Sequence, residues 1–241
     1  MKRILSSKIF KLSLSLFLVF SIGLVAFSTS AMAAKEKEEA QQILEKSKLT
    51  FESFMKDPHM GTMQEMLKIA KGVFISPQLL RGAFIVGVSG GSGIYINKTK
   101  DGEWSGPAFY TLGGASIGLQ VGGDASEVIL LIMSDKGTRA FESSNIKLGL
   151  DVGIAVGPVG RGLSAQTANL SADILSFSRA KGLYGGVSLK GAVVKARNGL
   201  NTYFYDKPLN PAQILRSPAS ANVSNMQLNE LLEEIAKAAR R

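Results

Sequence analysis

The chain has 241 residues, with 28 Lys and Arg against 19 Asp and Glu, one His, no Cys, and 26 Gly, which exceeds the roughly 7 % glycine usual in proteins. The lack of cysteine excludes a disulfide scaffold, a thiol nucleophile and a cysteine-ligated zinc, and the lone His59 excludes a multi-histidine metal centre. With 45 % hydrophobic and 20 % charged residues, the composition also excludes a disordered chain and a multi-span membrane protein.

Residues 1–33 have the pattern of a signal peptide. A basic start precedes an apolar run over 12–27, and small residues follow it around Ala33. The run is shorter than the roughly 20 apolar residues that span a bilayer. We therefore expect cleavage near Ala33 and an exported mature chain of bacterial type, periplasmic or peripherally associated with the cell envelope.

Two helices are expected over 34–72, at the start of the mature domain. The first, over 35–56, has many helix-favouring charged residues around an apolar stripe and ends before Pro58. The second begins at Thr62, which forms a capping box with Glu65, and continues to the end of the segment.

Met60, Met63 and Met66 raise the separate question of Cu(I) binding, because thioethers are ligands that suit this ion. Against it, Met63 and Met66 form an ordinary apolar core stripe with Leu67 and Ala70. We expect core packing and assign no metal and no cofactor.

Residues 73–206 form a glycine-rich block, since 23 of the 26 glycines lie between Gly82 and Gly199. Apolar and small residues alternate strictly over 114–122 and over 148–157, which predicts strands. A glycine face on a strand allows either tight packing of the sheet or an acyl chain between the strands. With helices on both sides, the block predicts an α+β fold with a glycine-rich antiparallel sheet or barrel-like core.

The C-terminal segment, 207–241, is expected to be helical. Asn210 begins a short helix that reaches Arg216. Ser224 and Gln227 form a capping box before a C-terminal amphipathic helix.

Enzymatic function is not expected. Two G-x-S-x-G patterns surround Ser89 and Ser116, but the histidine of such a triad follows its serine, whereas His59 precedes both. Since no nucleophile with a base, metal cluster or complete cofactor motif remains, no catalytic residue is assigned.

Charge is segregated along the chain. Residues 66–100 carry five bases and no acid, 101–160 are acidic overall, and 161–205 are basic again. Such segregation favours a basic surface for an anionic partner.

A set of motifs carries a resemblance to a known family, in the order and spacing of its members. They are Ser89–Gly93, Trp104–Ala108, Ser116–Gly122, Ala155–Arg161, Ser176–Leu189 and Asn201–Tyr205. The chain resembles the SYLF domain family, also described as a yeast-type actin-binding domain, over about residues 40–206. It departs from the family pattern at Phe177, where tyrosine is usual, and at Asp206, where glycine is common.

The resemblance implies a lipid-binding module, with phosphoinositides and actin as ligands of eukaryotic members. An exported chain is not expected to meet actin. We expect a nonenzymatic protein that binds anionic phospholipid on a membrane surface, and no nucleic-acid partner. The alternatives are a structural or protein-interaction module of the envelope, with a protein partner there, and a carrier of an acyl chain between glycine-faced strands.

The candidate lipid-binding residues are basic side chains and two aromatic ones that serve either as interfacial anchors or as core. They are Lys71, Arg81, Arg161, Arg179, Lys181, Trp104 and Phe109.

The signal peptide is testable by mass spectrometry of the protein purified from the cell envelope. The measured mass should correspond to a chain that begins near Ala34. A purified protein that retains Met1 would contradict the expectation of cleavage.

Overall fold

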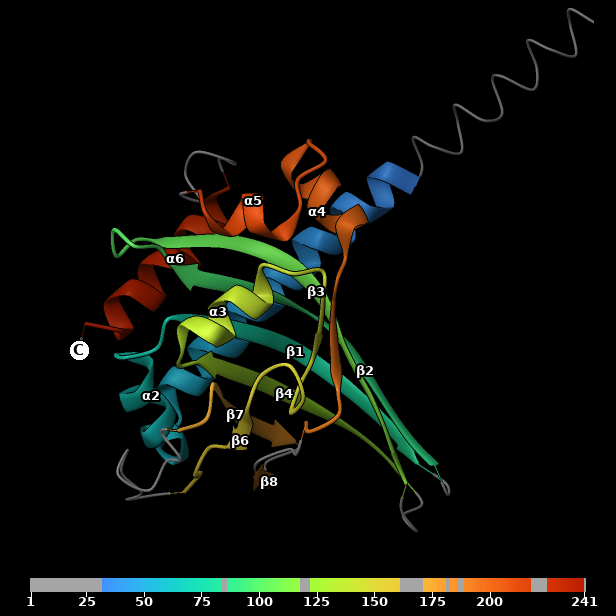
Figure 1. Cartoon of the computed structure of the whole chain (residues 1–241), viewed down its shortest axis with the longest axis vertical. Helices are drawn as coiled ribbons and strands as arrows, with labels where there is room; N and C mark the ends of the chain where they lie inside the picture. Colours follow the sequence, from blue (N-terminus) through green and yellow to red (C-terminus); the bar gives the residue numbers. More distant parts are fainter. Residues whose placement is uncertain are drawn as a thin grey trace, which may run out of the picture.

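The computed structural model describes residues 32–83, 86–117, 122–160, 171–180, 183–185, 189–217 and 225–240, so the expected signal peptide lies outside the described residues. A strongly curved sheet forms the centre of the molecule and helices pack against it (Figure 1). The predicted α+β class, with N-terminal helices and a barrel-like sheet, is confirmed.

Nine strands form one sheet in the described part of the chain. They are β1 (Gly72–Ala83), β2 (Val86–Lys98), β3 (Trp104–Ile117), β4 (Gly122–Ile132), β5 (Asn145–Lys147), β6 (Ile154–Val156), β7 (Ile174–Ala180), β8 (Leu183–Gly185) and β9 (Val193–Ala196). The order is β5-β9-β3-β2-β1-β4-β7-β6, with β8 paired to β7. The pairing is antiparallel as predicted, except between β6 and β7, which are parallel.

Helices precede, interrupt and follow these strands. They are the N-terminal helix over 32–56, the 3-10 helix η1 (Pro58–Met60), α2 (Gly61–Leu67), α3 (Asp135–Phe141), α4 (Asn198–Tyr205), α5 (Pro211–Leu215) and α6 (Met226–Ala238). Within the described ranges, none of the helices has both the length and the apolar character needed to cross a bilayer.

Two helix ends follow the sequence signals. The N-terminal helix ends before Pro58, and the Asp57 carboxylate then caps η1 by accepting a hydrogen bond from the backbone N–H of His59. The predicted short helix is α5, where Asn210 and Gln213 form a full capping box.

Two predicted caps are wrong. No side chain caps α2, because η1 runs directly into it, and α2 ends at Leu67 rather than at residue 72. For α6 the cap is Asn225, one residue after the predicted serine, and its side chain accepts from the backbone N–H of Leu228.

The sheet buries apolar side chains on both faces. On one face the ring of Tyr95 stacks on Phe141 of α3 at 4.1 Å between centroids, and Phe74 packs against the same ring at 5.8 Å. On the other face Phe109 packs against Phe204 of α4 at 5.1 Å. Because burying one large side chain stabilises a fold by about 1.5–3 kcal/mol, these contacts hold α3 and α4 on opposite sides of the sheet.

The strand predicted over 148–157 is mostly a turn, and only β6 at its end is strand. Gly149 has φ of 86°, a left-handed conformation that reverses the chain, and Leu148 forms an isolated bridge with Val152. Leu148 and Val152 are buried while Leu150 between them is exposed, so the alternation reflects a turn. The strand predicted over 114–122 is confirmed as far as Ile117, and residues 118–121 lie outside the described ranges.

A bulge in β1 explains two of the glycines. The pairing of β1 shifts register between Ile75 and Leu80 on the β2 side and at the same place on the β4 side, where Pro77 removes an N–H donor. A Cβ at Gly91 would lie 2.2 Å from the carbonyl oxygen of Gln78, so only glycine allows this approach.

The same close packing occurs at Gly93, where a Cβ would lie 2.4 Å from the carbonyl oxygen of Ile75. At Gly157 a Cβ would meet the ring of Phe177 at 2.3 Å. At these three positions the chain itself fills the space that an acyl chain would need, which supports the tight-packing interpretation of the glycine faces.

Replacement of Gly91 by alanine should destabilise the fold by roughly 1–3 kcal/mol, because the added methyl group overlaps the backbone of the bulge. Gly90→Ala is the matched control, since a Cβ there meets nothing within 4 Å. Urea unfolding followed by circular dichroism measures both. Equal midpoints for the two variants would contradict the close approach.

Candidate functional site

Those predicted site residues that the structure describes do not gather on one surface. Arg161 and Lys181 lie outside the described residues. Lys71 immediately precedes β1 and Arg81 is near its far end, which at about 3.3 Å per residue separates them by on the order of 30 Å. Phe109 is completely buried.

Arg179 is a structural clamp between the N-terminal helix and the sheet. Its Nε and Nη2 donate to Glu127 Oε2 at 3.0 and 2.5 Å, and Nη1 lies 3.3 Å from Asp57 Oδ2. Nη2 also donates to Ser53 Oγ at 2.7 Å.

The charge of Arg179 is therefore committed to carboxylates of the chain. Desolvation by itself would lower the pKa of Arg179, but the hydrogen bonds and charges of Glu127 and Asp57 outweigh it and raise the pKa above its ordinary value. The guanidinium also lies 5.1 Å over the ring of Phe54, where it makes a cation–π contact. In this position Arg179 holds two segments together and presents little free charge to a ligand.

Lys71 and Trp104 belong to one end of the molecule, which we call the basic end and define by its six cations. They are Lys68, Lys71, Lys98, Lys100, Lys237 and Arg240. The hairpin of β1 and β2 brings the first four together, since the backbone N–H of Lys98 donates to the carbonyl of Lys71. Trp104, 8 % exposed, lines a cavity of about 720 Å³ with Lys237 and Arg240 of the C-terminal region.

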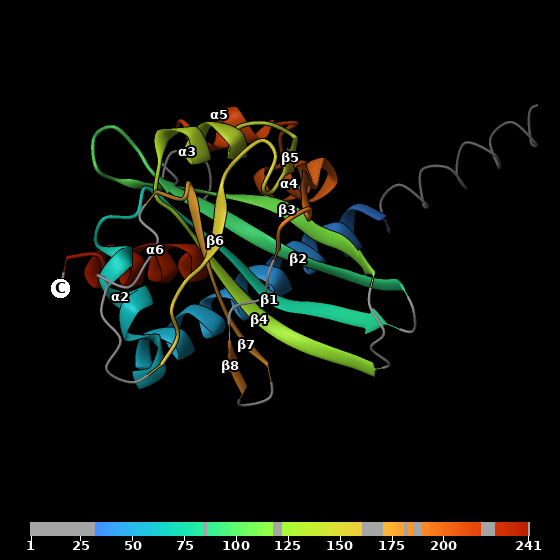
Figure 2. The same cartoon turned by 60° about the horizontal axis from the view of Figure 1, so that its bottom comes forward.

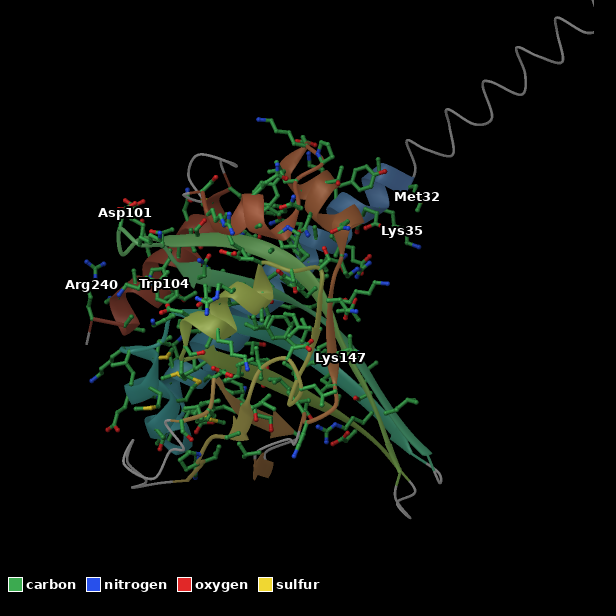
Figure 3. All side chains as sticks on the ribbon, viewed as in Figure 1. Met32, Lys35, Asp101, Trp104, Lys147 and Arg240 are labelled. Carbon is green, nitrogen blue, oxygen red and sulfur yellow. The ribbon has the colours of Figure 1, made fainter. Side chains whose placement is uncertain are left out.

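Carboxylates nearly balance the charge of the basic end. Lys71 is paired with Asp135 at 2.6 Å, and four more acids lie on the same segments: Glu65, Asp101, Glu103 and Glu233. Figure 3 shows Asp101, Trp104 and Arg240 close to one another, with Lys147 well away from them. The basic end is therefore rich in charge but has little net charge.

A second cationic surface, which we call the lysine ridge, consists of Lys147, Leu150, Lys190 and Lys195. Leu150 is 76 % exposed at the tip of the turn that follows β5. Within the described part of the chain, none of the three ammonium groups forms an ion pair. Leu150 thus stands exposed at a tip that also carries Lys147, Lys190 and the carboxylate of Asp151, while Lys195 lies further along β9.

The backbone fixes the lysine ridge. The backbone N–H of Leu150 donates to the carbonyl of Lys147, and the Asp151 carboxylate accepts from the backbone N–H of Lys147 at 2.7 Å. Lys190 lies against Gly149, where a Cβ would be 2.7 Å from its Cγ. Lys195 is on the same face of the β5–β9 pair as Lys147, at the diagonal position.

Sequence reasoning missed the ridge because the alternation over 148–157 hid the turn. Two signals were present, namely the two glycines at 149 and 153 and Asp151 between them, since Gly and Asp favour tight turns. Lys190 is distant in sequence, so only the packing of β5 against β9 brings it to Leu150.

The described residues contain no group of three or more His, Asp or Glu placed to hold a metal ion. Met60, Met63 and Met66 are buried in the core, as their spacing predicted. Ser89 donates a hydrogen bond to the carbonyl of Gly114 at 3.4 Å, whereas His59 contacts Asp57.

Comparison with known proteins identifies related chains. Residues 113–238 match the family model Ysc84, described as "Las17-binding protein actin regulator". The human SH3 domain-containing YSC84-like protein 1 is 31 % identical over 170 residues, covering 70 % of this chain and 49 % of the human protein. Protein YSC84 of Saccharomyces cerevisiae is 32 % identical over 176 residues, 71 % of this chain and 37 % of that protein.

The chain therefore spans about half the length of the human relative and less of the yeast one. LAS seventeen-binding protein 3 of S. cerevisiae matches in the same way, with 32 % identity over 145 residues, 58 % of this chain and 31 % of that protein.

The clamp is testable through stability. Arg179→Met should lower the free energy of unfolding by about 2–3 kcal/mol, less than for a fully buried pair, because it leaves the Asp57 and Glu127 carboxylates without their cation. Arg216→Met, which breaks an exposed ion pair with Glu142, is the control and should lose much less. Urea unfolding measures both variants. If they lose a similar free energy of unfolding, Arg179 forms an ordinary surface ion pair and does not act as a clamp.

Proposed function

The chain belongs to the Ysc84 family of SYLF domains, and on that premise we propose that it is an exported, nonenzymatic protein that binds anionic phospholipid at a membrane surface through the lysine ridge. The family is of a binding type, and its description and the names of its members refer to actin regulation and Las17 binding. Those descriptions suggest protein partners and concern longer proteins. The basic start and apolar run of residues 1–33 support export.

The observation that carries the proposal is the exposed Leu150 beside Lys147 and Lys190, neither of which forms an ion pair in the described part of the chain. Each lysine near an anionic bilayer contributes about 1 kcal/mol, and burial of a leucine side chain contributes roughly 1.5–3 kcal/mol. Together these terms give weak, reversible attachment. Lysine ammonium groups act as point charges without the fixed fork of arginine, so we expect a preference for negative charge rather than for one headgroup.

Attachment should also be salt-sensitive, because exposed charges are screened over about 8–10 Å at physiological ionic strength. The leucine contribution does not depend on salt. The two contributions can therefore be separated by substitution and by ionic strength.

Cosedimentation of the mature chain with phosphatidylcholine vesicles, with and without phosphatidylglycerol and at low and high salt, tests the function. We expect binding only with phosphatidylglycerol, and weaker binding at high salt. Lys147→Glu with Lys190→Glu should reduce the vesicle affinity at least about tenfold, because each lost lysine charge removes roughly 1 kcal/mol of binding free energy. Leu150→Ser should weaken binding but keep its salt dependence.

The control is Lys98→Glu with Lys100→Glu at the basic end, which changes the net charge by the same amount. We expect this variant to bind nearly as well as the original chain. If both double variants lose vesicle binding equally, the binding surface is not the lysine ridge. If binding is independent of both phosphatidylglycerol and salt, the proposed function is wrong.

A further inference from the structure

Within the described residues, the outer edge of β4 has no strand partner at its beginning. The ladder between β4 and β7 extends only from Ile132 to Glu127, and no described strand pairs with residues 122–126 on that side. Figure 2 shows β4 continuing beyond β7 and β8. An open edge presents unpaired N–H and C=O groups, which form a template for another strand.

A groove of about 510 Å³ adjoins this edge. Its sides are the N-terminal helix with Leu49, the β1 bulge with Pro77, the end of the open edge at Ala125 and Ser126, and the clamp residue Arg179. Leu49 is 59 % exposed. Leu80, the register partner of Ala125, is exposed as well and extends the apolar surface along the sheet.

Ser126 gives a second, independent indication of a ligand. Ser126 is 2 % exposed, and its Oγ has no hydrogen-bond partner within the described residues. Because side chains alternate along β4, this hydroxyl lies on the face of the sheet opposite to Ala125 and Glu127. A buried hydroxyl without a partner costs about 1–3 kcal/mol, which a polar side chain on that face of an added strand would recover. Lys46, at the rim of the groove, forms no ion pair within the described residues.

We propose that residues 122–126 of β4 and the adjoining groove bind an extended peptide segment of a partner protein, which adds to the sheet as a further strand. The peptide backbone pairs with the open edge. One of its apolar side chains lies over Leu49 and Ala125, a polar group reaches Ser126, and an acidic side chain pairs with Lys46. This mode of recognition takes affinity from the main chain and specificity from alternate side chains.

The chemistry favours a peptide over other occupants. An acyl chain would fill the apolar part of the groove but would leave the edge and the Ser126 hydroxyl without hydrogen bonds. A second copy pairing through the same edge in antiparallel fashion, centred on residue 124, would bring two Asp124 side chains opposite each other, which is unfavourable. The inference is independent of lipid binding, which involves β5 and β9.

The test is selection of a random nine-residue peptide library on the folded mature chain, with counter-selection on Leu49→Asp. We expect enrichment of sequences that alternate apolar and polar residues and carry an acidic residue. A selected peptide should slow hydrogen exchange at the amides of residues 122–126. The same peptide with alternate N-methylated amides should not bind, because it cannot pair with the edge.

Matched variants locate the contact. Leu49→Asp should weaken binding of the selected peptide about tenfold, and Ser126→Ala severalfold. Ile69→Asp is the control, since Ile69 is 58 % exposed on a different surface, and it should not change the affinity.

Three results would overturn the proposal: no enrichment, protection that falls outside residues 122–126, or a concentration-dependent dimer in analytical ultracentrifugation that Leu49→Asp abolishes. Vesicle binding is measured separately, so failure here leaves the lipid proposal intact.

Discussion

The contact of the β1 bulge with Gly91 and Gly93 of β2 separates two parts of the sheet, one packed between helices and one that extends beyond them. The backbone of β1 comes so near to β2 that a single methyl group at Gly91 would overlap Gln78. Below the bulge the strands pack between α3 and α4 and form the core. Beyond it, β1 to β4 continue past the helices as four neighbouring strands in the order β3-β2-β1-β4, with β4 at the outer side (Figures 1 and 2).

Three arginines are committed to contacts within the chain. Arg179 joins the N-terminal helix to β4 and β7, and Arg197 joins the same helix to β2 through Glu39 and Ser92. Arg216 is paired with Glu142. Because these guanidinium groups hold elements together, they contribute little free charge to a ligand. The three lysines of the lysine ridge form no ion pair in the described part of the chain, and the exposed Leu150 beside two of them adds an apolar contact that the basic end lacks.

The two proposed surfaces lie at different ends of the strand order. The lysine ridge is on β5 and β9, whereas the peptide edge is on β4, with β3, β2 and β1 between β9 and β4. At about 4.8 Å per strand, the two surfaces are on the order of 20 Å apart. A protein attached to a membrane through the ridge would keep the β4 edge available, which fits a module that recruits a partner to a surface.

The sequence by itself determined the fold class, the helix that ends before Pro58, the capped helix at Asn210 and the burial of Met60, Met63 and Met66. Each depends on local signals, namely caps, proline and periodicity. The tertiary structure decided the rest. It paired Arg179 with carboxylates from distant segments and turned the alternating residues around Leu150 into an exposed tip. It also brought Lys190 beside that tip, because strand pairing joins residues that no local pattern relates.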